Sequence, residues 1–308
     1  MRTSAFGSSS AAALACAFAL ALPGRAAAQS CCAGASALTP ARLALHEDAL
    51  VGLQLKAADL YGSFDGKRSF LGAPAGAKEF DFEQDIAGSI RVFKRGQLSA
   101  ILPMVETYRS VPVLSEVGGD LGDLQLGARW DFTIPGSSVT IPGIALAVGA
   151  TLPTGRAPES SSKPLATDAT GIGAFQGSLA LAVEQTFGPW LVNVTGSVAW
   201  RAPRTVGYVY SQQGVQFVTV AAGGYSFPSG PVLALTLAYT AEVDATINGA
   251  TLPGSGRAAT RIGVAGGLPF NDLWRMQGSL STDLPIHFFG LNQPTSAGFT
   301  LMFLRSWS

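Results

Sequence analysis

The sequence has few charged residues and few long apolar runs. Asp, Glu, Lys and Arg make up 13% of the 308 residues, whereas hydrophobic residues make up 47%. A typical soluble domain carries about 25% charged residues, so the deficit indicates that much of the surface faces something other than water. Beyond the N-terminal region no apolar run reaches the roughly 18 residues of a transmembrane helix. If the chain resides in a membrane, it must therefore cross it with strands.

Cysteine and histidine are also scarce, with three cysteines and two histidines in the chain. The three cysteines lie near the start of the chain, at Cys16, Cys31 and Cys32. Two neighbouring cysteines cannot build a disulfide framework, although export would expose them to an oxidising compartment. A metal site can be drawn from His46, Glu47 and Asp48, but their spacing matches no zinc or haem pattern. We therefore expect no metal and no cofactor, and an unspecialised tail in this region.

The first 28 residues have the composition of a secretory signal peptide. Arg2 precedes an apolar stretch from Ala11 to Leu22, and the small residues around Ala28 offer a cleavage site. Removing Arg2 and Arg25 leaves 18 basic residues against 20 acidic ones. Nucleic-acid binding needs a clustered positive surplus, so this balance excludes a nucleic-acid partner.

The stretch from Gly118 to Gly155 shows the strand pattern most clearly. Apolar Leu124, Leu126, Ala128 and Trp130 alternate with Gln125, Gly127, Arg129 and Asp131. A period of two places successive side chains on opposite faces of a strand. Similar alternation predicts about twelve strands from residue 49 to the C-terminus, with charges of both signs on the polar faces and Leu, Val, Phe and Trp on the apolar faces.

The connections between these strands alternate in length. Short turns are expected at 94–97, 135–142, 187–190, 227–231 and 269–272, and longer loops at 65–79, 110–118, 153–171, 202–213, 246–257 and 285–294. Short–long alternation over an even number of strands is typical of an outer-membrane barrel, with short turns and both termini in the periplasm. A β-sandwich would bury its apolar faces against each other and scatter its loop lengths. We therefore predict an all-β fold, an antiparallel up-and-down transmembrane β-barrel in the cell outer membrane.

Three segments follow from these observations. Residues 1–28 are the expected signal peptide, residues 29–48 a periplasmic N-terminal segment that can act as a plug, and residues 49–308 the barrel. The last strand carries a pattern that resembles the terminal strand recognised by the barrel-assembly machinery, in which Gly298, Leu301 and Phe303 are the key positions. Outer-membrane lipids and that machinery are therefore the expected partners, together with a small-molecule solute.

The central motifs also resemble a known family. Gly119-Asp120-Leu121-Gly122-Asp123-Leu124, Gly127-Ala128-Arg129-Trp130 and Leu152-Pro153-Thr154-Gly155 are similar to the outer-membrane family assigned to the meta-pathway of phenol degradation. The resemblance covers residues 115–160 in motif detail and the remainder in architecture. It implies transport of small, often aromatic compounds, and it carries no binding residue across to this chain.

The polar faces supply the candidate functional residues. Opposite charges on neighbouring strands either pair and fill the lumen or set up a transverse field that selects polar solutes. We expect pairing for most of them and a constriction role for a few. The candidates that we expect to line the lumen are Glu83, Arg91, Asp123, Arg129, Asp131, Glu184, Arg201, Glu242, Arg261, Arg275 and Asp283.

An enzyme needs catalytic groups, and this sequence offers few. Ser281, Asp283 and His287 can be arranged on paper as a lipid-hydrolase triad, but the alternation turns Ser281 inward while His287 sits at the membrane interface. We expect a non-enzymatic channel for passive diffusion of small, hydrophobic or aromatic solutes. The alternatives are a sealed structural or adhesive barrel whose outer loops bind partners, and an outer-membrane lipid-modifying enzyme.

Overall fold

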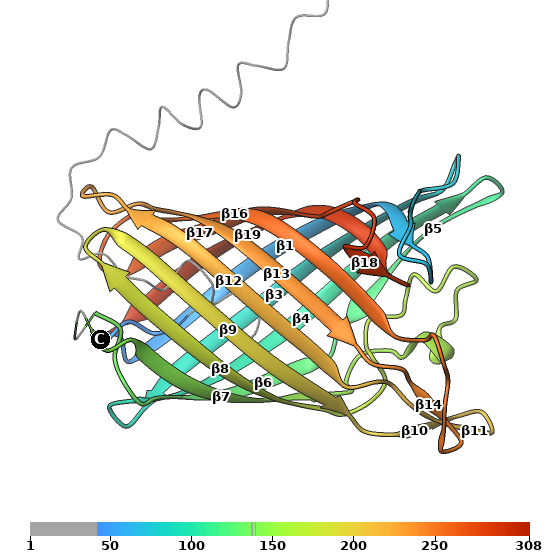
Figure 1. The fold of residues 1–308 in the computed structure, drawn as a ribbon, viewed down its shortest axis with the longest axis horizontal. Coiled ribbons are helices and arrows are strands. Elements are labelled where there is room, and N and C mark those ends of the chain that lie inside the picture. The colour runs from blue at the N-terminus through green and yellow to red at the C-terminus, as the bar shows by residue number, and fades with distance from the viewer. Residues whose placement is uncertain (1–41, 137, 139) are drawn as a thin grey trace, which may run out of the picture.

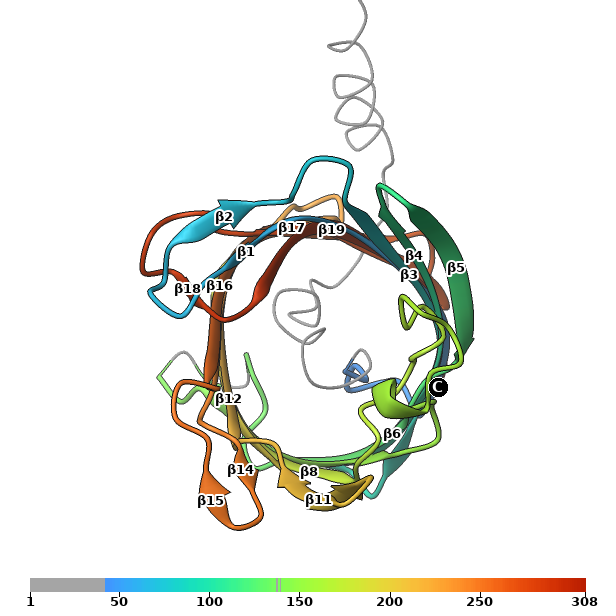
Figure 2. The same ribbon diagram turned by 90° about the vertical axis from the view of Figure 1, so that its right-hand side faces the viewer.

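The chain folds into a closed β-barrel, seen from the side in Figure 1 and along its axis in Figure 2. The computed structural model describes residues 42–136, 138 and 140–308. Within them, 12 antiparallel strands form the barrel wall, and pairing of β13 with β16 closes it. The wall strands are β1 (Ala49–Phe64), β3 (Lys78–Val92), β4 (Gly96–Val111), β6 (Leu124–Asp131), β7 (Gly143–Leu152), β8 (Gln176–Phe187), β9 (Trp190–Arg201), β12 (Gln216–Ser226), β13 (Val232–Glu242), β16 (Arg257–Pro269), β17 (Trp274–Asp283) and β19 (Pro294–Trp307). The predicted fold class and strand number are confirmed.

Consecutive wall strands are neighbours, and the last strand pairs with the first. β19 lies between β1 and β17, with Ala49 opposite Trp307 and Trp274 opposite Arg305. Closure leaves no open sheet edge in the wall, as a bilayer requires of strands that span it. Among the described residues, no helix is long and apolar enough to cross a membrane.

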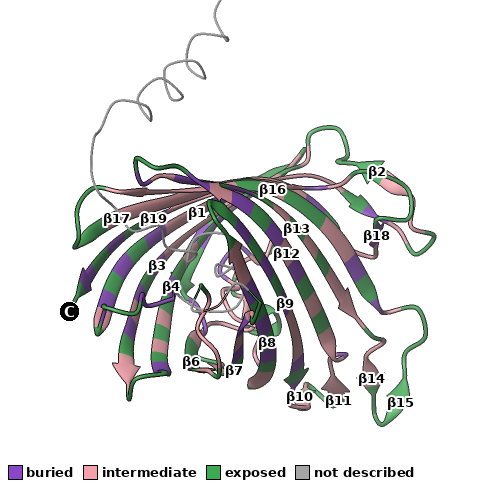
Figure 3. Ribbon diagram, turned by 60° about the vertical axis from the view of Figure 1, so that its left-hand side comes forward, coloured by how far each residue is buried: buried purple, intermediate pink, exposed green. Residues whose placement is uncertain are grey.

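The two faces of the wall differ as the alternation predicts, and burial alternates along strands such as β8, β9 and β12 in Figure 3. On β8, Leu179, Leu181 and Val183 are exposed on the outside. Their neighbours Ala180, Ala182 and Glu184 point inward and are buried. An exposed apolar band of this extent on every strand is the outer surface of a membrane barrel, because lipid is the solvent that accepts it.

The two ends of the barrel are built differently. One end, which we call the short-turn end, carries tight connections such as Gly188-Pro189 and the C-terminus. The other, the loop end, carries long connections that contain the short strands β2 (Phe70–Gly72), β10 (Arg204–Val206), β11 (Val209–Gln212), β14 (Thr246–Ile247), β15 (Ala250–Thr251) and β18 (Gly290–Leu291), and a 3₁₀ turn at Pro158–Ser160. β10, β11, β14 and β15 form a separate small sheet there.

The predicted loop at 110–118 is instead a continued hairpin. β4 runs to Val111, turns, and returns as β5 (Leu114–Leu121), which pairs with the loop-end half of β4. The chain then breaks at Gly122 and Asp123 before β6 pairs with the other half of β4. The break faces Pro103, whose ring nitrogen cannot donate to a ladder, although its carbonyl accepts the N–H of Gly122 at 2.8 Å.

Candidate functional site

The barrel interior is the candidate functional site, and its charges gather into groups. Alternation turns every second side chain of each strand inward, so charges from neighbouring strands meet in cross-strand rows. Ten of the eleven predicted candidates lie at such inward positions and form ion pairs or hydrogen bonds there. The eleventh, Asp123, lies at the break between β5 and β6.

One group surrounds the segment 42–48 at the short-turn end. Arg42 lies 2.7 Å from a carboxylate oxygen of Glu184 and 3.2 Å from one of Asp131. Arg129 bridges the same two carboxylates from the wall, at 3.0 Å to each. The four side chains are at most 13% exposed. Two arginines and two acids therefore neutralise one another and attach the chain before β1 to β6 and β8.

A second set of contacts attaches this segment to the opposite part of the wall. Glu47 forms an ion pair with Arg275 of β17, and Arg91 of β3 donates to the Glu47 carbonyl at 2.8 Å and to the Ala44 carbonyl. Burial alone raises the pKa of Glu47, but hydrogen bonds from Arg275 and the Ala44 N–H, with the Arg275 charge, lower that pKa below its usual range.

Apolar contacts complete the attachment. Leu43 packs in a buried cluster with Leu50, Met302 and Leu304, which point inward from β1 and β19. The Leu43 N–H donates to the Gln97 side chain at 3.0 Å. Residues 42–48 thus occupy the short-turn end of the lumen. Of the segment predicted as a plug, residues 29–41 lie outside the described residues, and so do the expected signal peptide and all three cysteines.

The middle of the lumen carries ion pairs between neighbouring strands. Lys56 of β1 contacts Glu83 at 2.8 Å and Asp85 at 2.7 Å, and Arg261 of β16 binds Asp283 of β17 through two hydrogen bonds of 3.0 Å. Four successive inward positions of β3 are acidic, namely Glu79, Asp81, Glu83 and Asp85. Arg201 lies 2.7 Å from Glu242, nearer the loop end.

Asp123 has a different role from the one predicted. Its Oδ1 accepts the N–H of Gly155 at 2.8 Å and its Oδ2 accepts the N–H of Ile172 at 2.7 Å. Thr154 bridges the same break, donating to the Gly122 carbonyl and accepting the Leu124 N–H, both at 2.9 Å. Two of the three motifs of the family resemblance, the one that contains Asp123 and the one that contains Thr154 and Gly155, therefore meet in space. They anchor the long loop between β7 and β8 to the wall, and both oxygens of Asp123 are occupied.

That loop is also fixed internally by Asp168. Its carboxylate accepts hydrogen bonds from the hydroxyls of Ser161 and Ser162 and lies 2.6 Å from the Arg156 guanidinium. The serine hydroxyls, the Ser162 N–H and then Arg156 lower the pKa of Asp168 well below its usual range. The loop edge runs beside β5, where Lys163 donates to the Val117 carbonyl.

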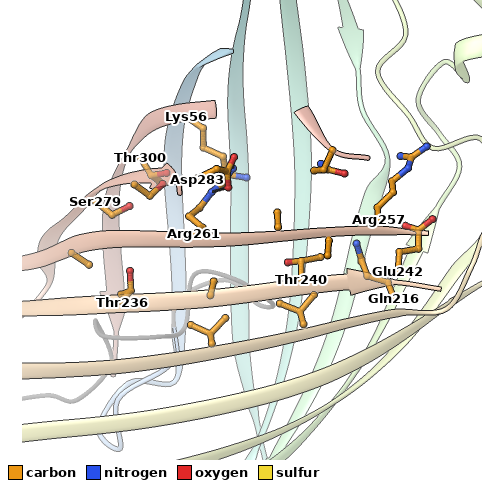
Figure 4. A pocket seen from close by; sticks show the side chains of 18 of the residues that line it. Lys56, Gln216, Thr236, Thr240, Glu242, Arg257, Arg261, Ser279, Asp283 and Thr300 are labelled. Carbon is orange, nitrogen blue, oxygen red and sulfur yellow. Dashed lines mark hydrogen bonds and ion pairs between the residues drawn. The ribbon is translucent and has the colours of Figure 1, made fainter. Parts of the chain in front are cut away.

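Among the described residues, two neighbouring cavities extend along the inner wall. The larger, of about 500 Å³, is lined by β1, β12, β13, β16, β17 and β19, and Figure 4 shows its side chains. The smaller, of about 170 Å³, continues along β4, β6, β7, β8 and β9 and shares Gln216 and Val218 with the first. Most of the lining consists of Ala, Val, Ser, Thr and Gln, so the wall between the ion pairs is uncharged.

The triad drawn from the sequence does not assemble. Asp283 is occupied by Arg261 and by the N–H of Ser296 at 2.8 Å. His287 is exposed in the loop after β17, where its ring lies 3.8 Å from that of Phe288. Among the described residues no group of three or more His, Cys, Asp or Glu side chains is arranged to hold a metal ion.

Several lumen residues were absent from the predicted set. Arg42 and Glu47 precede the first strand, where no period indicates a partner. Lys56, Glu79, Asp81 and Asp85 do follow the period of two, so extending the strand analysis to every inward charge would have found them. Arg257 was assigned to a loop, although β16 begins there.

Comparison with known proteins places the chain in a family. The family model described as "Putative MetA-pathway of phenol degradation" matches residues 70–301. The chain belongs to this family. The match extends well beyond the 115–160 region that carries the motif resemblance, and covers most of the barrel. No curated protein matches the chain.

Comparison with solved structures finds one with the same architecture and others of lower similarity. An outer membrane channel from Pseudomonas putida F1 has a TM-score of 0.72 at 17% identity, covering 88% of this chain and 98% of that one. The translocator domain of the autotransporter NalP from Neisseria meningitidis has a TM-score of 0.45 at 10% identity, covering 85% and 88%. The first similarity shows that the two chains share the β-barrel fold.

Proposed function

We propose that this protein is a passive outer-membrane channel for small solutes. The observation that carries the proposal is the contrast between the two faces of the wall. Outside lies an apolar band, and inside lies a cavity of about 500 Å³ lined mainly by small and polar side chains. A barrel of about eight strands is so narrow that its own side chains fill the interior, and barrels of 16–18 strands enclose open water-filled pores. A barrel of twelve strands lies between these two in width.

The orientation follows from loop length. Bacterial outer-membrane barrels place short turns in the periplasm and long loops outside. By this rule the short-turn end, with both termini, faces the periplasm, and the loops after β4, β7 and β9 face the exterior. Lipids then contact the apolar band, and β19, with Gly298, Leu301 and Phe303, presents its edge to the assembly machinery before the barrel closes.

The solute class is proposed from the family and the lumen together. The family description refers to phenol degradation, and the wall between the ion pairs offers methyl and hydroxyl groups to a small aromatic solute. The lumen charges that pair with each other leave the path uncharged over much of the wall. No catalytic step is needed, because the solute moves down its own gradient.

Residues 42–48 narrow the periplasmic end in this proposal. They bind opposite parts of the wall through Arg42 and Glu47 and pack Leu43 against the inward leucines. Displacement of residues 42–47 would widen the path and leave the strand pairing of β1 intact, because the backbone hydrogen bonds of β1 to its two neighbours begin at Asp48, which bonds to Trp307 and Arg91.

Single-channel conductance in planar bilayers tests the proposal. We expect a steady ohmic current from the mature protein and a larger one from a variant that lacks Cys31 to Asp48. Current from the shortened variant alone would make the segment a complete plug. Silence from both, with folding verified by the different gel mobility of unheated and boiled samples, would contradict an open pore and favour a sealed barrel.

A further inference from the structure

The larger cavity contains a recess with a cation at one side. Three cross-strand rows of β12, β13 and β16 define it: Gln216–Glu242–Arg257, then Val218–Thr240–Ala259, then Val220–Ala238–Arg261. Figure 4 shows the first row near the loop end and Arg261 further along the wall. All nine residues line the cavity. The middle row consists of small side chains, so it forms a floor between two rows that end in arginine.

The two arginines differ in their partners. Arg261 binds both oxygens of Asp283, so its charge is compensated. Within the part of the chain that the structure describes, the side chain of Arg257 makes no hydrogen bond or ion pair. Its cross-strand neighbour Glu242 is bound by Arg201 at 2.7 Å instead. Arg201, Glu242 and Arg257 together therefore carry one uncompensated positive charge.

Among the described residues, no other acid forms an ion pair with Arg257 either. Asp244, which follows β13, uses its carboxylate to accept the N–H groups of Gly256 at 2.7 Å and Gly254 at 3.3 Å. Lys56, the third cation of the cavity, is bound by Glu83 and Asp85. A guanidinium offers five donors in a planar fork that matches a carboxylate, and an exposed fork beside an uncharged floor can bind one.

The dimensions of the recess limit the rest of the ligand. Arg257 and Arg261 are four residues apart on one strand, which corresponds to about 13 Å between their Cα atoms. Val218, Ala259 and the methyl group of Thr240 cover the distance between them, and this surface suits a flat apolar body better than a polar one. The Thr240 hydroxyl adds a single donor or acceptor.

We propose that this recess is a binding site for small aromatic carboxylates, with Arg257 holding the carboxylate and the floor of Val218, Thr240 and Ala259 contacting the ring. The site deepens the proposed channel function, because it names a class of solute that the channel would hold on its path. The anionic group distinguishes this class from neutral aromatic compounds.

Equilibrium binding to the full detergent-solubilised protein tests the site, with benzoate as the probe. Binding does not require an open path, so a silent channel would contradict the proposed function without affecting this measurement. We expect benzoate to bind more tightly than benzyl alcohol, which has no charge, and than acetate, which has no ring. Equal binding of benzoate and benzyl alcohol would overturn the role of the cation.

Substitutions locate the site. Arg257→Gln should weaken benzoate binding by about tenfold and Arg257→Lys by less, because lysine keeps the charge and loses the fork. Lys67→Gln is the matched control, because it removes one positive charge from an exposed loop at the same end of the barrel. Ala259→Leu, which fills the floor and leaves Arg257 in place, should also weaken binding.

Each result has a clear meaning once gel mobility shows that the variants fold. If Arg257→Gln binds benzoate as wild type does, the proposed site is wrong. If Lys67→Gln weakens binding as much as Arg257→Gln, positive charge acts only at long range, and the proposed site is again wrong. If the channel conducts, benzoate should also reduce its current, and this effect should disappear in Arg257→Gln.

Discussion

The guanidinium of Arg42 lies 2.7 Å from the carboxylate of Glu184, although 142 residues separate them in the chain. Arg129 lies 3.0 Å from the same carboxylate. Glu184 therefore joins the wall to the segment before β1. When Arg42 is removed, Arg129 still contacts both Glu184 and Asp131, so each carboxylate keeps a partner while the group gains one net negative charge.

Arg42→Ala should accordingly open the short-turn end. Loss of the two contacts to Glu184 and Asp131 frees the beginning of the segment, and we expect a higher single-channel conductance than in wild type. Lys94→Ala, in the turn between β3 and β4, is a control for the loss of one positive charge at the same end. An unchanged conductance would mean that Leu43 and Glu47 hold the segment on their own.

Acid should open the same end through Glu47. Because the pKa of Glu47 is lowered below its ordinary value of 4.5, its attachment to Arg275 is complete above pH 4.5 and is lost as the pH falls through the lower folded value. Conductance should therefore increase in strongly acidic buffer, and a pH series from 7 to acid would show the step.

Glu47→Gln provides the comparison for this acid step. It has no carboxylate to protonate, so its conductance should be high at neutral pH and should show no further increase in acid. If wild type and Glu47→Gln show the same step, another group causes it, and the exposed Asp48 is the next acid to substitute.

The anchor of the long loop predicts a change in protease sensitivity. In Asp123→Asn an amide NH₂ replaces one of the two carboxylate oxygens. Because an NH₂ group donates and does not accept, the N–H of either Gly155 or Ile172 loses its acceptor. A buried N–H without a partner costs about 1–3 kcal/mol. The loop should then open more often, and trypsin should cleave after Arg156 faster than in wild type.

Asp120→Asn is the matched control for this experiment. Asp120 lies on β5 in the same motif, but its side chain is 51% exposed and its contact with Arg156 is long, at 3.4 Å. Such surface pairs contribute little, so the cleavage rate should change only slightly. Equal acceleration in both variants would show that the loop depends on charge near Arg156 and not on the acceptor geometry of Asp123.

The fold was largely predictable because lipid and lumen impose the alternation that the sequence displays. On β9, Trp190, Val192 and Val194 alternate with Leu191, Asn193 and Thr195, and the strand follows that pattern from end to end. Turn residues such as Gly188-Pro189 then locate the strand ends. Both signals are local, so one sequence is enough to read them.

The site was less predictable because pairing depends on register and on segments without a period. The sequence places Arg201 and Glu242 on inward faces, but only the register brings Arg201 within reach of Glu242 and leaves Arg257 without a partner. Asp123 follows the same alternation as Gln125, and only the position of the long loop shows that it binds backbone N–H groups. Glu47 lies before β1, in a segment without alternating polar and apolar residues, so no sequence pattern indicates which residue it contacts.

Barrel closure predicts a difference between two glycines. A Cβ added at Gly298 of β19 would lie 2.4 Å from the carbonyl oxygen of Ala57, in the seam between the first and last strands. A Cβ added at Gly223 of β12 would meet no atom within 4 Å. Both positions are in wall strands, so the change from glycine to alanine alters the strand propensity equally at each. The two positions differ in the space available to the added methyl group.

Gly298→Ala should therefore destabilise the barrel while Gly223→Ala should not. Overpacking of this kind typically costs about 1–3 kcal/mol, because the backbone of the seam must move to relieve the contact. Refolding into lipid vesicles, followed by comparison of unheated and boiled samples on gels, gives the folded fraction of each variant. A lower folded fraction for Gly298→Ala alone would locate the constraint in the β1–β19 seam. Equal yields would show that the seam can widen to accept the added methyl group.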